Sequence, residues 1–144
     1  MEELMLLRKM VEEHDYSAAL AIIDEMEEMA KDDKINKVES YIEILLIHLI
    51  KQHAEKRTTR SWELSINNSL YRIFRVNKRR KANGFYQTEE ELRETIDEAF
   101  PIALSIAAEE AFGGAYTAAQ LSTMIDRDEL KRQSLEKIMG YKPQ

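Results

Sequence analysis

The chain has 144 residues, of which 33% are charged and 44% hydrophobic, with four Gly, two Pro and no Cys. This length is typical of one domain, which buries roughly two-thirds of its unfolded surface. The absence of Cys excludes disulfides, thiolate metal sites and cysteine nucleophiles, and it suits a reducing compartment. The acidic N-terminus predicts no secretory signal, and the most apolar window, residues 41–50, is about half the length that a bilayer crossing needs. We therefore expect a soluble, cytoplasmic protein with a single domain over residues 1–144.

The charge is distributed unevenly along the chain. The net charge of -6 divides into -8 for residues 1–50, +8 for residues 51–81 and -6 for residues 82–144. A basic middle can form a patch for an anionic partner. The alternative, which we favour, is that the acidic ends neutralise the basic middle when the helices fold together.

Three helices are predicted in the first part of the chain. Apolar residues at helical spacing predict helices over residues 3–13 and 16–31, with Asp15 as the N-cap of the second. Residues 32–34 are expected to form a short link to a third helix over residues 36–55. Nowhere in the sequence do apolar and polar residues alternate over four residues between turn signals, so no β-strand is predicted.

The third predicted helix is apolar around most of its circumference from Tyr41 to Ile50. A helix of this kind is surrounded by other helices, so we expect it to be the core element. Leu45 and Leu49 are four residues apart in its most apolar part. Both are predicted to lie in the centre of the protein.

A basic turn, residues 56–60, is predicted to join this helix to an antiparallel partner over residues 61–82. Thr59 or Ser61 is expected to cap the partner helix. Asn83-Gly84 is expected to end it, because Gly suits the left-handed residue that follows a helix. The two helices form the central hairpin of the predicted fold.

Capping-box patterns mark the helix starts in the last third of the chain, at Thr88, Thr117 and Asp126. Pro101 falls inside the first of these helices, and we expect a kink or a break at residues 98–100. The fold class predicted is all-α: a single-domain bundle of six or seven helices around the central hairpin. Residues 127–144 would add a C-terminal helix and tail.

The hairpin carries a pattern that is specific enough to suggest a family. Leu46-Ile47-His48-Leu49-Ile50-Lys51 is followed after eight residues by Arg60-Ser61-Trp62, and then by Ile66 and a basic helix. This pattern resembles the small bacterial helical proteins known as domain of unknown function 29, where a Leu-Met-His-Leu-Leu-Lys type segment precedes Arg-Ser-Trp. The helix around Pro101 and the Tyr116-Thr117 element are also similar to that family.

The resemblance covers about residues 3–126, with two departures. Gln52-His53 stands where the family commonly has an aromatic pair, and Ala115 stands where it has Pro before the Tyr-Thr element. The family has no established activity. The resemblance therefore implies a helical fold and implies no catalytic residue.

A search for catalytic and metal-binding patterns gives no candidate. No His has a Glu three residues before it, as a di-iron bundle requires. His48 and His53 lie about 140° apart on a helix, so they do not share a metal easily. Gly113-Gly114 lacks the Lys-Ser/Thr of a phosphate loop. We expect no catalytic residue, metal or cofactor, and an enzyme is the less favoured class.

His48 lies on the most apolar helix. We expect a buried polar residue that is hydrogen-bonded to a neighbour; the alternative is a ligand or general base. Arg60 directly precedes the helix that carries Trp62. We assign Arg60 a structural role first, because a guanidinium can bridge a carboxylate and helix-end carbonyls.

Two functions remain open. The favoured one is a non-enzymatic structural or protein-interaction protein that binds another protein or a copy of itself. The other is a nucleic-acid-binding protein that uses the basic residues 56–81. The low pI of 5.2 and the lack of an evident recognition helix or interleaved aromatic platform speak against it. Its candidate contacts to an anionic partner are Arg57, Arg60, Arg72, Arg75 and Arg79, of which the last three share one helix face.

Overall fold

The computed structural model describes residues 2–79 and 84–143. The chain divides into two compact units, residues 1–34 and 35–144. The described residues form six α-helices and one short 3₁₀ helix, so the predicted all-α class is confirmed. The expectation of one domain over the whole chain stays a prediction. None of the described helices is long and apolar enough to cross a membrane.

The first unit is a hairpin of two helices. It consists of α1 (Glu2–Glu12) and the part of α2 (Tyr16–Glu55) that precedes Ile35. His14 adopts a left-handed φ of 61° in the turn, and Asp15 caps α2 by accepting a hydrogen bond from the Ala18 backbone N–H at 3.3 Å. No residue of α1 is buried, and Ala19 is the one buried residue among those described in this unit.

The predicted link at residues 32–34 is wrong, because α2 is one helix of 40 residues. Asp32-Asp33-Lys34 contains no Gly or Pro. Polar residues of this kind cost only a few tenths of a kcal/mol each in a helix, which is too little to end it without a competing structure. A change of polarity was therefore misinterpreted as a helix boundary.

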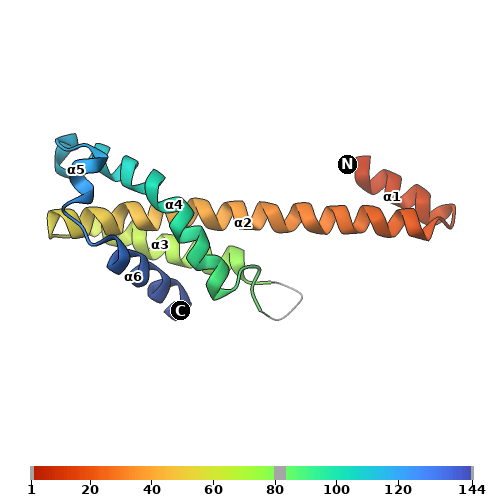
Figure 1. The fold of residues 1–144 in the computed structure, drawn as a ribbon. Coiled ribbons are helices and arrows are strands. Elements are labelled where there is room, and N and C mark those ends of the chain that lie inside the picture. Colours follow the sequence, from red (N-terminus) through yellow and green to blue (C-terminus); the bar gives the residue numbers. More distant parts are fainter. Residues whose placement is uncertain (1, 80–83, 144) are drawn as a thin grey trace. The chain divides into compact units, whose positions relative to one another are not determined.

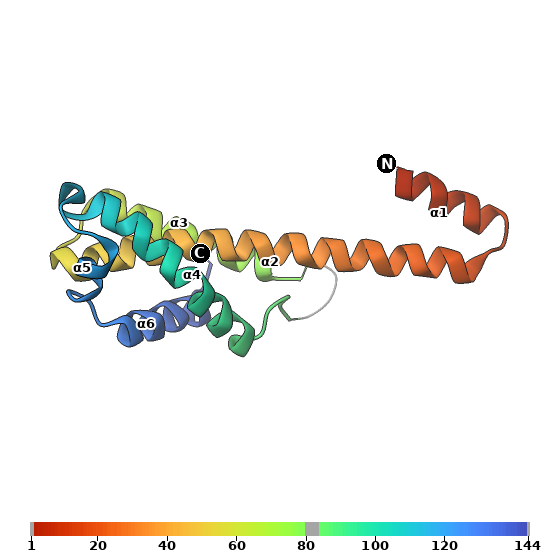
Figure 2. The same ribbon diagram turned by 45° about the horizontal axis from the view of Figure 1, so that its top comes forward.

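The second unit has its core on the later part of α2, and α3 (Arg60–Asn77) lies beside that part in Figures 1 and 2. Leu45 is fully buried and Leu49 is 3% exposed, so both predicted core positions are confirmed. Lys56 adopts a left-handed φ of 54° after α2 ends. Thr59 then caps α3 by accepting a hydrogen bond from the Trp62 backbone N–H at 3.1 Å, as predicted.

The end of α3 differs from the prediction, because the helix stops at Asn77 and not at residue 82. The Asn77 carbonyl accepts a hydrogen bond from the Tyr86 N–H at 2.8 Å, and the buried Asn77 side chain exchanges two hydrogen bonds with the Gln87 backbone. Lys78 pairs with Phe85 in an isolated antiparallel bridge. These bonds replace the next helical turn. Residue 83 of the predicted stop lies outside the described residues, and Gly84 has a positive φ of 92°.

Four short or medium elements complete the second unit: α4 (Glu89–Glu110), the 3₁₀ helix η1 (Ala111–Gly114), α5 (Ala118–Ser122) and α6 (Arg127–Gly140). Thr88 and Thr117 form complete capping boxes, and Asp126 caps α6 through the Glu129 N–H, so all three predicted starts are confirmed. α4 contacts α5 and α6, and α3 contacts α6.

Pro101 does not break α4, which continues through it as one helix, so of the predicted kink or break, the break is wrong. Pro101 itself is exposed, while Phe100 beside it is fully buried. Burial of the apolar residues on both sides of the Pro outweighs the cost of a Pro inside a helix, about 3 kcal/mol for the lost hydrogen bond and the clash with the preceding turn together. The largest fully buried side chains of the core are Phe100, Ile42, Leu45, Leu46, Ile50, Ile73, Leu92 and Ile96.

Candidate functional site

Trp62 lies between two cations at the turn of the central hairpin. The indole is 9% exposed, and its ring centroid is 4.9 Å from Lys51 Nζ and 4.8 Å from the Arg57 guanidinium carbon. The ring faces carry partial negative charge, so both contacts are attractive. Lys51 and Trp62, which both belong to the family-like pattern, are therefore in contact.

Carboxylates neutralise both of these cations. Lys51 is 6% exposed and donates to Glu110 Oε1 at 2.9 Å. Arg57 donates to Glu55 Oε1 at 2.9 Å, and Glu55 Oε2 accepts the Phe112 backbone N–H at 3.2 Å. Burial alone raises the pKa of Glu55, but the hydrogen bonds from Arg57 and Phe112 with the nearby positive charges outweigh it and lower that pKa. These bonds join α2 to α4 and to η1.

His48 is half-buried on α2, next to the Lys51 and Glu110 pair. Its Nδ1 atom is buried and has no hydrogen-bond partner among the described residues, so the predicted hydrogen bond is not formed by this atom. Burial lowers the pKa of His48, the Lys51 charge lowers it further, and Glu110 opposes both. The imidazole is therefore neutral near pH 7.

The basic residues of the turn have different surroundings. Arg57 is held by Glu55 and Trp62. Arg60 is exposed and forms no hydrogen bond or ion pair within the described part of the chain, so the bridge expected of it is not present. Arg57 thus has the structural contacts that the sequence assigned to Arg60.

We call the exposed side chains of Arg72 and Arg75 on α3, and of Lys78 and Arg79 directly after it, the α3 cationic face. Because α3 ends at Asn77, the prediction that Arg79 shares one helix face with Arg72 and Arg75 is wrong. Within residues 2–79 and 84–143, none of them forms an ion pair with a carboxylate. The neutralisation that the sequence favoured is therefore not found among the described residues. The chain itself supplies one reason, because no Asp or Glu occurs between Glu63 and Glu89 while six Lys or Arg do. Two of those six, Arg80 and Lys81, lie outside the described residues.

Aromatic rings accompany every member of the α3 cationic face. The Arg72 and Arg75 guanidinium carbons both lie 5.8 Å from the Tyr71 ring centroid, and Arg75 donates to the Tyr71 hydroxyl at 3.1 Å. Lys78 Nζ lies 5.6 Å from the Phe74 ring. The remaining pair is Arg79 with Tyr86, at 5.4 Å. This interleaving was not predicted from the sequence, although the spacing of four between Tyr71 and Arg75 was a signal for it.

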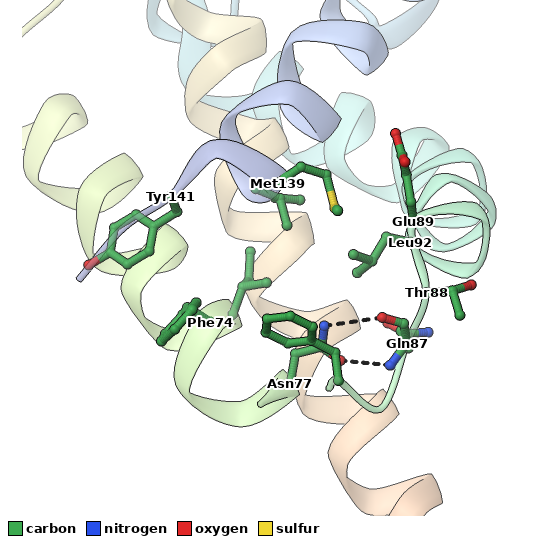
Figure 3. A pocket seen from close by; sticks show the side chains of 11 residues that line it. Phe74, Asn77, Gln87, Thr88, Glu89, Leu92, Met139 and Tyr141 are labelled. Atoms are coloured by element: carbon green, nitrogen blue, oxygen red, sulfur yellow. Dashed lines mark hydrogen bonds between the residues drawn. The ribbon is translucent and has the colours of Figure 1, made fainter. Parts of the chain in front are cut away.

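An apolar cavity of about 220 Å³ lies beside these aromatic residues (Figure 3). Phe74, Phe85 and Tyr141 form one part of its wall, and Leu92 and Met139 form the opposite part. The Phe74 ring contacts both other rings, with centroid distances of 6.1 Å to Phe85 and 5.8 Å to Tyr141. Phe85 is 49% exposed, so it presents an apolar surface to solvent beside the cavity.

Acidic residues give no sign of a metal centre. Within the residues that the structure describes, no group of three or more His, Asp or Glu is placed to hold an ion. Several carboxylates of α4 and α6 instead pair with neighbouring cations, as Asp97 does with Lys131 at 3.1 Å.

These features describe an all-α protein with a closed ion-pair cluster and a separate, unpaired cationic face. The family model for "Domain of unknown function DUF29" matches residues 5–132. The chain belongs to this family, as its hairpin pattern suggested, and the family has no assigned function. No curated protein and no solved structure matches the chain.

Proposed function

We propose that the protein is a non-enzymatic interaction protein whose N-terminal hairpin, residues 2–34, binds a helix of a partner protein. One observation carries the proposal: α1 has no buried residue, although its apolar residues follow helical spacing. The large exposed apolar residues of this hairpin are Leu4, Met5, Leu6, Val11, Tyr16, Leu20 and Met29.

The exposed apolar surface and the small size of the hairpin together indicate that it needs a partner. A hairpin of about 34 residues buries too little surface to be stable alone, and units below roughly 40 residues usually need a staple or a partner. Leu4 and Val11 are seven residues apart, and Tyr16 and Leu20 are four apart, so each pair lies on one helix face. A partner helix packed on these faces would remove their apolar surface from water at about 25 cal/mol per Å².

The charge of the hairpin indicates the chemistry of this partner. Residues 2–34 contain four Lys or Arg and 11 Asp or Glu, a net charge of -7. A second copy of the same hairpin would bring two such charges together, whereas a basic amphipathic helix would offset them. The partner we infer is therefore an amphipathic helix with Lys and Arg beside its apolar stripe. A cytoplasmic location, which the Cys-free composition favours, fits this role.

A binding measurement with designed peptides tests the proposal on the full chain. The probe is an 18-residue amphipathic peptide of Leu and Lys, and the matched probe replaces each Lys with Glu. We expect the Leu/Lys peptide to bind the wild-type protein and to lose at least tenfold in affinity with the double variant Leu4→Glu and Val11→Glu. Both positions are exposed, so the variant should keep its helical circular dichroism.

Lys9→Glu is the control variant, because it adds negative charge to the exposed polar face of the same helix. It should bind the Leu/Lys peptide at least as well as wild type. Equal binding of both peptides, or unchanged binding in the Leu4/Val11 variant, would contradict the proposal. A concentration-dependent dimer in light scattering that the same variant abolishes would replace the basic partner with a second copy.

A further inference from the structure

Within the described residues the α3 cationic face has no counter-charge, whereas several other cationic groups of the second unit are paired. Lys51, Arg93 and Arg132 each pair with at least one carboxylate. Arg72, Arg75 and Arg79 contact aromatic rings instead, and they remain exposed. Arg72 and Arg75 are like charges three residues apart on one helix and repel each other, so the fold keeps them together without gaining stability from them.

An anionic ligand would remove this repulsion. Arg72 and Arg75 are three residues apart, about 4.5 Å along the axis of α3, and Lys78 and Arg79 follow directly after the helix end at Asn77. A row of guanidinium groups at this spacing can contact successive phosphates of one nucleic-acid strand, because Arg matches phosphate oxygens with two parallel donors.

The aromatic rings indicate which anion fits. Tyr71 lies among the arginines, and the exposed Phe85 lies beside the cavity with Phe74 and Tyr141. Every base has a flat face that stacks on such rings, and this face is accessible in a single strand but covered in a duplex. In Figure 3 the Glu89 carboxylate lies across the cavity from Phe74.

We infer that the α3 cationic face and the Tyr71 and Phe85 rings bind single-stranded nucleic acid without strong sequence preference. The arginines contact phosphates, and the rings stack with bases. This surface lies on the second unit and involves no residue of the N-terminal hairpin, so it is independent of the proposed protein interaction. The inferred binding of nucleic acid differs in chemical class from the proposed binding of a partner protein.

Fluorescence anisotropy with a labelled 20-nucleotide oligo(dT) tests the inference on the full chain. With about four phosphate contacts, raising the salt from 50 to 150 mM should weaken binding about 20-fold, because each contact to a single strand contributes roughly 0.7 to the log-log slope. The triple variant Arg72→Ala, Arg75→Ala and Arg79→Ala should bind weakly at either concentration. Its remaining salt effect should be about twofold.

The matched control removes three exposed arginines that are paired with carboxylates: Arg8, Arg93 and Arg132. Its net charge equals that of the test variant, so a general charge effect would weaken both equally. We expect the control to retain wild-type binding within about threefold. Equal weakening of the two triple variants would overturn the inference, as would the absence of salt-dependent binding by the wild type.

Two further measurements separate a single strand from other anions. Tyr71→Leu and Phe85→Leu should each weaken oligo(dT) binding by about tenfold if bases stack on these rings, while leaving binding of a poly-glutamate peptide unchanged. Poly-glutamate binding as tight as oligo(dT) binding would overturn the inference in favour of an acidic protein partner. Tighter binding of a 20-base-pair duplex would overturn the assignment to single strands.

Discussion

The hairpin turn and the end of α3 place cations against aromatic rings in similar ways, but only the first has carboxylates. Lys51 and Arg57 lie 4.9 and 4.8 Å from the Trp62 ring and pair with Glu110 and Glu55. Arg72 and Arg75 lie 5.8 Å from the Tyr71 ring and pair with no carboxylate among the described residues. The same residue types are therefore neutralised within the fold at the turn, whereas at the end of α3 their charge is available to a partner.

Burial explains the difference. Trp62 is 9% exposed, and Lys51 is 6% exposed, so a cation at the turn must be neutralised. The arginines of α3 are exposed, and water stabilises their charge without any partner. The turn is thus a structural site, and the end of α3 is the better candidate for an interaction surface.

The largest loss of stability is expected from removal of the Trp62 ring at the hairpin turn. Trp62→Ala should lower the free energy of unfolding by about 3 to 5 kcal/mol, because a large buried ring leaves a cavity. Tyr71→Ala should cost less than about 2 kcal/mol, since its ring is only half-buried. Urea denaturation of both variants measures the difference. Losses of equal size would remove the distinction between the two regions.

The next effect concerns the buried cation and depends on which partner is removed. Glu110→Gln should cost about 1 to 3 kcal/mol, because it leaves Lys51 buried without a counter-charge. Lys51→Met should cost less than about 1 kcal/mol, since Met fills the same space and the Glu110 side chain, 46% exposed, is then solvated. The reverse order in chemical denaturation would show that Glu110, and not Lys51, is the strained member of the pair.

The sequence predicted the local features of the fold well. Thr59, Thr88 and Thr117 were assigned as helix caps because cap residues act on backbone groups only two or three positions away. The end of α3 was predicted wrongly because it depends on Asn77 bonding to the backbone of Gln87, ten residues later. No local propensity reports such a bond.

The candidate site was predictable only in part. The spacing of Arg72 and Arg75 predicted their common helix face from the sequence alone. The prediction was wrong for Arg79, which lies beyond the helix end at Asn77. Whether carboxylates neutralise them depends on which helices pack nearby, and net charge does not carry that information. The same gap explains why Arg60 received a structural role that the contacts instead assign to Arg57.

The free energy of unfolding should depend on pH through His48, which lies next to the Lys51 and Glu110 pair. Burial lowers the pKa of His48 below its ordinary value of 6.5, and Lys51 lowers it further, against the opposing effect of Glu110. The unfolded chain then binds a proton more readily, so stability is complete above pH 6.5 and falls as the pH drops below it. The denaturation midpoint should decrease between pH 7 and 5.5. His48→Asn should remove most of that decrease, and an unchanged decrease in this variant would exclude His48 as its source.

The smallest expected effect, and the one whose sign is most informative, is that of the α3 cationic face on stability. Replacing Arg72, Arg75 and Arg79 together with Ala removes the repulsion between Arg72 and Arg75 on α3, about 0.2 to 0.5 kcal/mol, and the charge of Arg79 just beyond the helix end. It also introduces the residue with the highest helix propensity. We therefore expect the free energy of unfolding to rise slightly, by less than about 1 kcal/mol, in urea denaturation at low salt. The gain should shrink at high salt, where surface charges are screened. A loss of stability at low salt would mean that the arginines are paired within the folded chain after all, and they would then belong with Lys51 and Arg57 as structural cations.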